Sequence, residues 1–263
     1  MQDLRHVCGL PVWLEDDQYT LGFGEGLLAP TPDVRRLEDL RPVLYNQTIS
    51  EPEEIYYMYR SVSQRQERDA LAARGLRFDL TVLPNRMLGQ EFMKTAGHYH
   101  PRLPGSDLTY PELYQVVAGR AHFLLQKARG DGGILTDVVI VEADAGDYLL
   151  VPPGYGHITI NPCDETLVLA NWVDASFASL YQTMVKYRGG AFYEVKDNGQ
   201  AVFVENERYQ ECPTPRMVKP GLPQIEGLKG DAIYQLSRDA LGFLSDPAAY
   251  HQCLSKVLAE QDM

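Results

Sequence analysis

Two histidines separated by one residue, His98 and His100, begin a stretch whose residue types suit metal binding. Alternate side chains of a β-strand lie on one face of its sheet, so both imidazoles would point the same way and chelate one ion. Glu112 follows an insertion rich in proline and glycine and would share a strand face with Tyr114 and Val116. A histidine pair of this spacing often occurs by chance on exposed strands, so the pair alone indicates a metal site only weakly.

A third histidine, His157, follows a Pro-Pro-Gly turn. In a strand, His157, Thr159 and Asn161 would face the side opposite Ile158 and Ile160. A polar inner face makes sense if the interior of the domain holds a metal and a polar ligand. The candidate ligand set is three imidazoles and one carboxylate, which suits Fe(II), Mn(II), Ni(II) or Zn(II), and the ligand types do not choose among these ions.

The elements that must position these side chains are short β-strands. From about residue 75 to about residue 175, segments rich in Val, Ile, Leu, Tyr and Phe are separated by Gly, Pro and Asp at intervals of roughly eight to twelve residues. That rhythm is typical of an all-β sandwich or barrel. A further hairpin is predicted around Asp197, Asn198 and Gly199.

The segments on either side of this β region have a different composition. An N-terminal extension over residues 1–74 contains a predicted helix that starts at Thr31 and Pro32, and we expect the extension to pack on the barrel or on a partner subunit. Residues 211–263 are predicted to form a proline-rich connector and a helical tail with an apolar stripe. The β domain between them is predicted to span residues 75–210.

Composition argues against several classes of protein. The 24 basic and 36 acidic side chains give a formal charge of −12, which argues against binding to nucleic acid or anionic lipid, because such binding depends on clustered Lys and Arg. The sequence shows neither a secretory signal nor a run of roughly 20 apolar residues, so no membrane association is expected. The four cysteines lack CxxC spacing, which favours neither a zinc knuckle nor a disulfide framework, and we expect a cytoplasmic protein.

The spacing around His157 resembles a known family motif. Gly146, five residues, Pro152, one residue, Gly154, two residues, His157, three residues and Asn161 reproduce the second cupin motif without departure. This match strengthens the prediction of a metal site inside the β domain.

The earlier histidine pair is similar to the latter part of the first cupin motif, which runs through His98, His100, Glu112 and Gly119. Two departures occur: Phe92 stands where the motif begins with glycine, and eleven residues instead of three or four separate His100 from Glu112. We interpret the insertion as a longer loop that still lets Glu112 return to the inner face. The resemblance implies an all-β core, a jelly-roll-like cupin β-barrel with an N-terminal extension and a helical C-terminal tail.

A more specific resemblance is to the cupin-type glucose-6-phosphate isomerases of archaea and some bacteria. It extends from IYYMYR to about YQTMVKYRGGAFY and rests on the segments LTVLP, KTAGHYH, YPELYQVVAGRAHFLLQ, AGDYLLVPPGYGHITINP and LANWV. Val173 follows Trp172 where archaeal members have a tyrosine, the loop before Glu112 is longer, and the chain extends past about residue 210. These features are similar to the bacterial branch of the family.

The resemblance implies a role for each matching residue. The implied ligands of one divalent metal per subunit, with Fe(II) first and Mn, Ni or Zn as alternatives, are His98, His100, Glu112 and His157. The implied substrate and phosphate contacts are Thr81, Thr95, Gly97, Tyr56 and Tyr59. The implied catalytic residues are Glu112 and Tyr114. Further candidates for holding an anion are Lys94, Arg60 and Arg102.

The implied reaction interconverts glucose 6-phosphate and fructose 6-phosphate, a step of glycolysis and gluconeogenesis. It moves a hydrogen between C1 and C2, which requires an acceptor for that hydrogen and an electrophile near the sugar oxygens. Glu112 is the candidate that moves a proton through a cis-enediol, and a metal-assisted hydride shift stays open. Tyr114 would hydrogen-bond the sugar hydroxyls or relay a proton.

The residues also leave two other functions open. One is another metal-dependent cupin enzyme, either a different sugar isomerase or a dioxygenase, and the other is a sugar-binding cupin without turnover. The intact ligand set argues against the second, because a binding barrel does not need it. The family and the exposed sheet edges of a lone barrel predict a homodimer that binds a small sugar phosphate.

Overall fold

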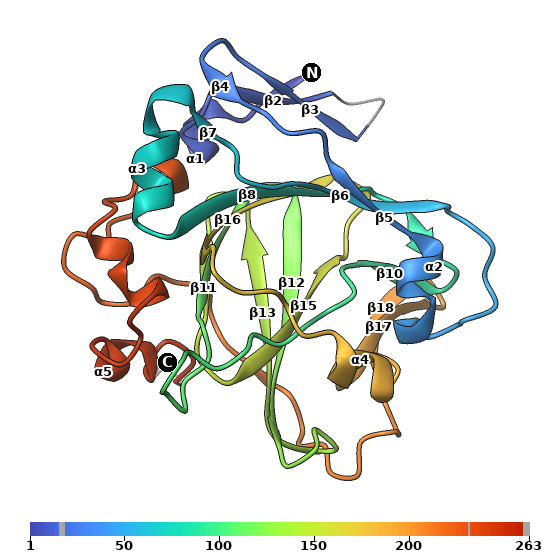
Figure 1. The fold of residues 1–263 in the computed structure, drawn as a ribbon. Coiled ribbons are helices and arrows are strands. Elements are labelled where there is room, and N and C mark those ends of the chain that lie inside the picture. The colour runs from blue at the N-terminus through green and yellow to red at the C-terminus, as the bar shows by residue number, and fades with distance from the viewer. Residues whose placement is uncertain (16–18, 231, 260–263) are drawn as a thin grey trace.

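The centre of the molecule is built from two large sheets, shown in Figure 1. The computed structural model describes residues 1–15, 19–230 and 232–259. The first sheet has the order β14 (Tyr148–Val151), β11 (Glu112–Ala118), β16 (Leu167–Asp174), β8 (Leu76–Leu83), β6 (Glu54–Tyr59) and β5 (Asp33–Arg36). The second has the order β18 (Gln200–Glu205), β17 (Phe192–Asp197), β10 (Glu91–Lys94), β15 (Tyr155–Asn161), β12 (Arg120–Arg129), β13 (Ile134–Asp144) and β19 (Arg216–Met217), with β9 (Met87–Leu88) paired to β10.

The inner faces of the two sheets pack against each other. Val116 and Leu169 of the first sheet belong to one buried cluster with Phe123 and Leu125 of the second. Because strand side chains alternate between faces, the residues between them point outward from the barrel. The predicted all-β core with a jelly-roll-like cupin barrel is confirmed by this arrangement.

A second buried cluster lies on the outer face of the first sheet. Phe78 of β8 and Trp172 of β16 are fully buried there, with ring centroids 4.8 Å apart. The indole nitrogen of Trp172 donates a hydrogen bond of 2.8 Å to the carbonyl oxygen of Ile233, and Tyr234 packs edge-on to Phe78. Leu10, from the opposite end of the chain, belongs to the same cluster. Figure 1 shows the C-terminal segment passing beside β11 and β16, and the N-terminal strands lying over β8.

Short elements complete the chain around the barrel. The remaining strands are β1 (Gln2–Asp3), β2 (Val12–Glu15), β3 (Thr20–Phe23), β4 (Leu27–Leu28) and β7 (Ser63–Gln64). The α-helices are α1 (Arg5–Cys8), α2 (Leu37–Leu40), α3 (Arg68–Ala73), α4 (Gln182–Lys186) and α5 (His251–Leu254). The 3₁₀ helices are η1 (Arg41–Val43), η2 (Arg65–Glu67), η3 (Ile233–Gln235) and η4 (Ala240–Leu244). Among the described residues, no helix is both long enough and apolar enough to span a membrane.

The prediction of a helix that starts at Thr31 and Pro32 is wrong for the first turn of that helix. The chain runs there as β5 and pairs with β6, with Val34 opposite Tyr57, and only α2 is helical. Pairing with an existing sheet outweighs a helix-cap signal that is worth on the order of 1 kcal/mol.

The C-terminal tail is helical as predicted, but in short pieces. Asp246 accepts a hydrogen bond from the backbone N–H of Ala249, as a helix cap does, yet the α-helix extends only over His251–Leu254. Leu254 and Leu258 of the predicted apolar stripe are buried. Packing against the barrel therefore shapes the tail more than helix propensity does.

Candidate metal centre and substrate cavity

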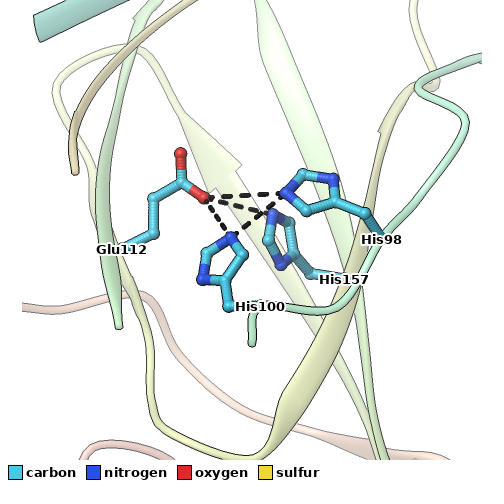
Figure 2. Close-up of side chains that lie close together, drawn as sticks. All are labelled: His98, His100, Glu112 and His157. Atoms are coloured by element: carbon cyan, nitrogen blue, oxygen red, sulfur yellow. Dashed lines mark hydrogen bonds and ion pairs between the residues drawn. The ribbon is translucent and has the colours of Figure 1, made fainter. Parts of the chain in front are cut away.

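The four residues predicted as metal ligands converge in the interior of the barrel, as Figure 2 shows. Glu112 begins β11, His157 lies in β15, and His98 and His100 lie in the segment between β10 and β11. The backbones of His98 and His157 exchange two hydrogen bonds of 3.1 and 3.0 Å. This bridge ties the histidine pair to β15, and so the two cupin motifs meet at one point.

The ligand atoms face a common centre. All four lie within 4.8 Å of one another. The Nε2 atom of His100 lies 3.1 Å from Oε2 of Glu112, and that of His157 lies 3.5 Å from the same oxygen. The Nε2 atoms of His98 and His100 are 3.1 Å apart. Three nitrogen donors and one carboxylate oxygen at this spacing can surround one divalent cation.

The surrounding hydrogen bonds support this use of the donors. Nδ1 of His100 donates to the carbonyl oxygen of Tyr110 at 2.8 Å, which leaves the lone pair of Nε2 facing the centre. The side-chain amide of Asn171 donates to Oε1 of Glu112 at 2.7 Å and leaves Oε2 for the centre. The Nδ1 atom of His157 is buried, and among the described residues it has no hydrogen-bond partner. The donor set therefore fits a metal ion.

Burial and mutual contact set the protonation of the ligands. Burial, helped by the neighbouring imidazoles of His157 and His100, holds the pKa of His98 well below 6.5. Burial also lowers the pKa of His157. For Glu112, burial alone would raise the pKa, but the close contacts of its carboxylate with the rings of His100 and His157 hold it well below 4.5. Neutral imidazoles and an ionised carboxylate are the forms that bind a metal.

Gly97 allows the backbone to place the histidine pair. Its φ angle of +74° lies in the left-handed region, and a Cβ atom there would come within 2.4 Å of the Ile158 side chain. A larger residue would push the segment of His98 away from β15. Gly97 does not line the cavity described next, so its placement indicates a role in backbone geometry.

The metal centre opens into a polar cavity whose walls follow the strand alternation. The wall residues of the first sheet are Tyr56, Met58, Arg60, Arg77, Asp79, Thr81, Glu112, Tyr114, Leu169, Asn171 and Val173. The opposite wall and the rim consist of Thr95, His98, His100, His157, Thr159, Phe177, Ser179 and Tyr181. The residues that β6, β8 and β16 contribute to the cavity therefore alternate along each strand.

The structure brings together most of the predicted site residues. Besides the four ligands, Thr81, Thr95, Tyr56 and Tyr114 line the cavity. Tyr59 does not, and this corrects the expectation made for it: its hydroxyl accepts a hydrogen bond from the backbone N–H of Leu21 on the outer face of β6. Tyr56 and Tyr59 are three positions apart, which places them on opposite faces of one strand.

Two of the three basic candidates also lie outside the cavity. Lys94 is buried against Glu91, 2.5 Å away, and Arg102 forms an exposed ion pair with Asp107. Only Arg60 of the three lines the cavity. The positive charge of a residue therefore does not show whether it lines the cavity unless its position in the strand alternation is also considered.

Several cavity residues were not predicted. Asn171 binds the carboxylate of Glu112, and Arg77 and Asp79 lie in the same strand phase as Thr81. Their alternation with Thr81 in the sequence could have predicted that Arg77 and Asp79 line the cavity. Asn171 had no comparable signal, because its contact depends on the pairing of β11 with β16, where it lies opposite Tyr114.

This chain is similar to known proteins over the region that contains the site. Residues 34–211, more than half of the chain, match the family model described as glucose-6-phosphate isomerase (GPI). The glucose-6-phosphate isomerase of Thermococcus onnurineus is 27% identical over 182 residues, which cover 67% of this chain and 87% of that protein. The enzyme of Thermococcus litoralis is 26% identical over 196 residues, which cover 72% and 94%. A solved structure of a Bacillus subtilis oxalate decarboxylase mutant gives a TM-score of 0.34 at 15% identity over 58% of this chain and 32% of that chain, too weak to bear on function.

The matched region includes both cupin motifs, the metal cluster and most of the cavity wall. Family, fold and ligand geometry point to the same enzyme class. The chain belongs to the glucose-6-phosphate isomerase family, in its cupin form with a three-histidine, one-glutamate metal cluster.

Proposed function

We propose that the cavity around His98, His100, Glu112 and His157 is where glucose 6-phosphate and fructose 6-phosphate are interconverted. The observation that carries this proposal is the position of the cluster inside a polar cavity, within the family-matched residues 34–211. Fe(II) is the leading candidate for the metal, with Mn(II), Ni(II) and Zn(II) as alternatives that suit the same ligands. His98, His100, Glu112 and His157 would hold the metal, which would supply an electrophile to polarise the oxygens on C1 and C2 of the sugar.

Glu112 is our candidate for the group that moves the proton. In the cis-enediol route, its carboxylate removes the proton from one of the two carbons and returns it to the other. The hydrogen bond from Asn171 holds Oε1 in place, so Oε2, which faces the metal centre, is the oxygen that would also have to take the proton. The low pKa of Glu112 keeps it ionised but makes it a weak base, which favours the direct hydride shift as the competing route.

Tyr114 is our candidate for the hydrogen-bond donor to the sugar. Its hydroxyl lies 3.2 Å from Nε2 of His157, next to the ligand atoms. Burial and the nearby Glu112 hold the pKa of Tyr114 well above 10, so the phenol keeps its proton. A neutral hydroxyl at this position donates to a sugar oxygen on which negative charge develops.

Hydroxyl groups elsewhere in the cavity would contact the sugar phosphate. Thr95 accepts a hydrogen bond from the backbone N–H of Thr159 through Oγ1, which leaves its own O–H free to donate. Thr81 and Tyr56 line the first-sheet wall. We assign substrate contacts to Thr81, Thr95 and Tyr56, and we assign to Gly97 the placement of the histidine pair.

We further infer that the chain belongs to the bacterial branch of the family and acts as a homodimer. The long loop before Glu112 and the segment past residue 210 support the first inference. The second rests on the exposed edge strands of a lone barrel. Light scattering at micromolar concentration tests the dimer directly, and a monomer mass contradicts it.

The isomerase assignment is tested by turnover of fructose 6-phosphate in a coupled assay. The protein is stripped of metal and reloaded separately with Fe(II), Mn(II), Ni(II) or Zn(II). We expect glucose 6-phosphate to form only with metal, and fastest with Fe(II). Absence of product with every metal, in protein shown to bind them, would overturn the substrate assignment.

The two routes for hydrogen transfer are separated by running the reaction in D₂O. Proton transfer through Glu112 lets solvent deuterium enter the product at C1 or C2. A hydride shift keeps the original hydrogen, so product free of deuterium would remove the acid–base role of Glu112.

A further inference from the structure

The ring of His100 is held from two sides by residues that are not metal ligands. Its Nδ1 atom donates to the carbonyl oxygen of Tyr110 at 2.8 Å. The ring of Phe177 packs against the imidazole, with centroids 4.6 Å apart and planes at 51°. The His100 side chain is only 1% exposed, compared with 17% for His98. His100 is therefore the more enclosed member of the histidine pair.

Tyr110 lies at the end of the long loop that precedes Glu112. Its backbone N–H donates to the carbonyl oxygen of Pro101 at 3.3 Å and closes the base of the loop. Oγ1 of Thr109 accepts a hydrogen bond of 2.8 Å from the backbone N–H of Gly154, in the turn of the second cupin motif. These two contacts fasten the loop to the barrel beside the metal centre, and they hold Tyr110 in place with it.

Phe177 follows β16 and packs between His100 and Tyr110. Its ring is stacked on that of Tyr110, with centroids 4.6 Å apart and planes at 21°. Tyr110 is buried, and Phe177 also lines the cavity. Offset stacking of this kind is a favoured arrangement of two aromatic rings. Tyr110 therefore supports Phe177 on the side away from His100.

The segment that carries Phe177 is anchored to the C-terminal tail. The buried carboxylate of Asp174 accepts a hydrogen bond of 2.8 Å from the backbone N–H of Ser176 through Oδ1. Its Oδ2 accepts one of 2.6 Å from the hydroxyl of Ser245 in the tail. The hydroxyls of Ser176 and Tyr110 lie 3.2 Å apart. The long loop, the segment after β16 and the tail therefore meet beside the metal centre.

A histidine binds a metal more tightly when its neighbours already hold the ring in the binding orientation, because less freedom is lost on binding. The hydrogen bond from Nδ1 fixes which nitrogen of His100 faces the metal centre, and the ring of Phe177 blocks rotation of the imidazole toward its side. Loss of a partner that orients a metal ligand typically lowers metal affinity roughly 10- to 100-fold.

We propose that Tyr110 and Phe177 form a clamp that holds His100 in its metal-binding orientation, and that the long loop before Glu112 serves to retain the metal. Both are positioning residues, since neither side chain belongs to the cluster of four ligands. The inference goes beyond the proposed function, because it concerns the metal alone and holds for any sugar that the cavity binds.

The test measures binding of Mn(II) to the full chain. The EPR signal of free Mn(II) during titration gives the dissociation constant, and the same signal after addition of excess EDTA gives the rate of release. The variants are Phe177→Ala, Phe177→Leu and Tyr110→Ala, the last of which removes the supporting ring but keeps the backbone carbonyl. Phe203→Ala is the control, because it removes the same side chain from a partly buried position outside the cavity.

We expect Phe177→Ala to weaken binding of Mn(II) at least tenfold and to speed its release. Phe177→Leu, which fills part of the same space, should weaken binding by a smaller factor. Tyr110→Ala should also weaken binding by a smaller factor, because Phe177 loses its support. Phe203→Ala should bind Mn(II) as the wild type does.

A loss of less than tenfold in folded Phe177→Ala would overturn the proposal. If that variant does not fold, Phe177→Leu and Tyr110→Ala take its place, and an affinity unchanged in either would overturn it. An equal loss in Phe203→Ala would overturn it as well, because the effect would then reflect a general loss of packing. Failure of the isomerase assignment would appear separately, in the coupled assay, and would leave the Mn(II) affinities as they are.

Discussion

The two faces of the first sheet differ in the side chains they present. Toward the barrel, β8 and β16 present polar side chains such as Asp79 and Asn171, and these serve the metal centre and its cavity. Away from the barrel, the same strands present Phe78 and Trp172 to a packed aromatic cluster. One strand therefore carries chemistry on one face and stability on the other, and substitutions on the two faces should separate into losses of activity and losses of folding.

The largest effect is expected from Glu112→Gln on the inner face. Loss of the carboxylate should lower kcat roughly 10³-fold, because it removes the proposed proton-transfer group, which is also the anionic residue of the metal cluster. Turnover at fixed metal loading is the measurement, with metal content determined in parallel. A rate above one-tenth of wild type at full metal loading would contradict the catalytic role.

On the outer face, Trp172→Ala should lower the free energy of unfolding by about 3–5 kcal/mol, because a fully buried indole is removed from a packed cluster. Urea unfolding measures it. Trp172→Phe is the matched variant: it keeps an aromatic ring but loses the hydrogen bond to Ile233, and should cost less. Equal losses in the two variants would show that packing is not the main contribution.

Removal of a single hydroxyl from a tyrosine on each face of the first sheet tests the same difference between the faces. Tyr114→Phe should lower kcat by roughly 10- to 100-fold with little change in stability, since its hydroxyl faces the ligand atoms. Tyr59→Phe should leave kcat unchanged and lower the free energy of unfolding by about 1 kcal/mol, since its hydroxyl accepts from Leu21 on the outer face. Loss of activity in Tyr59→Phe would break the comparison.

The stability of the protein should also depend on pH. The pKa of His98 and of His157 is lowered by burial in the folded protein, so below pH 6.5 the unfolded chain takes up protons that the folded protein does not. Acidification of metal-free protein from pH 6.5 to 5 should therefore destabilise it, by up to roughly 1 kcal/mol per pH unit for each histidine. Glu112 does not act in this window, because its pKa lies well below 4.5.

Urea midpoints across this pH range measure the effect. His98→Gln should show a shallower decline with falling pH, whereas His6→Gln, at an exposed position, should follow the wild type. A midpoint that rises on acidification would contradict the assignment of neutral histidines.

The metal centre was predictable from the sequence because the spacing of its residues matches the two cupin motifs. Within each cupin motif the residue spacing identifies the ligands, and the pairing of His98 with His157 then brings the two motifs together. The hairpin at Asn198 and Gly199 is confirmed as well: both residues have positive φ, as a two-residue turn requires.

What could not be predicted depends on pairing between distant strands. Asn171 reaches Glu112 because β16 lies beside β11 in a particular register, and no local pattern encodes that register. The prediction of an N-terminal helix was wrong for a related reason, since part of that segment pairs with β6 as a strand. The error at Tyr59 is different, because strand alternation from Tyr56 could have prevented it. The domain limits at residues 74 and 210 stay a prediction.

The aromatic cluster outside the barrel is completed by residues from both ends of the chain, with Leu10 on one side and Ile233 and Tyr234 on the other. During synthesis on the ribosome, the part of the outer surface of β8 and β16 that Ile233 and Tyr234 cover stays exposed until the tail emerges. Phe78 and Trp172 then form an adhesive surface on the nascent protein, of the kind that molecular chaperones bind. The barrel should therefore need such protection late in translation, when the sheets have formed but their cover has not.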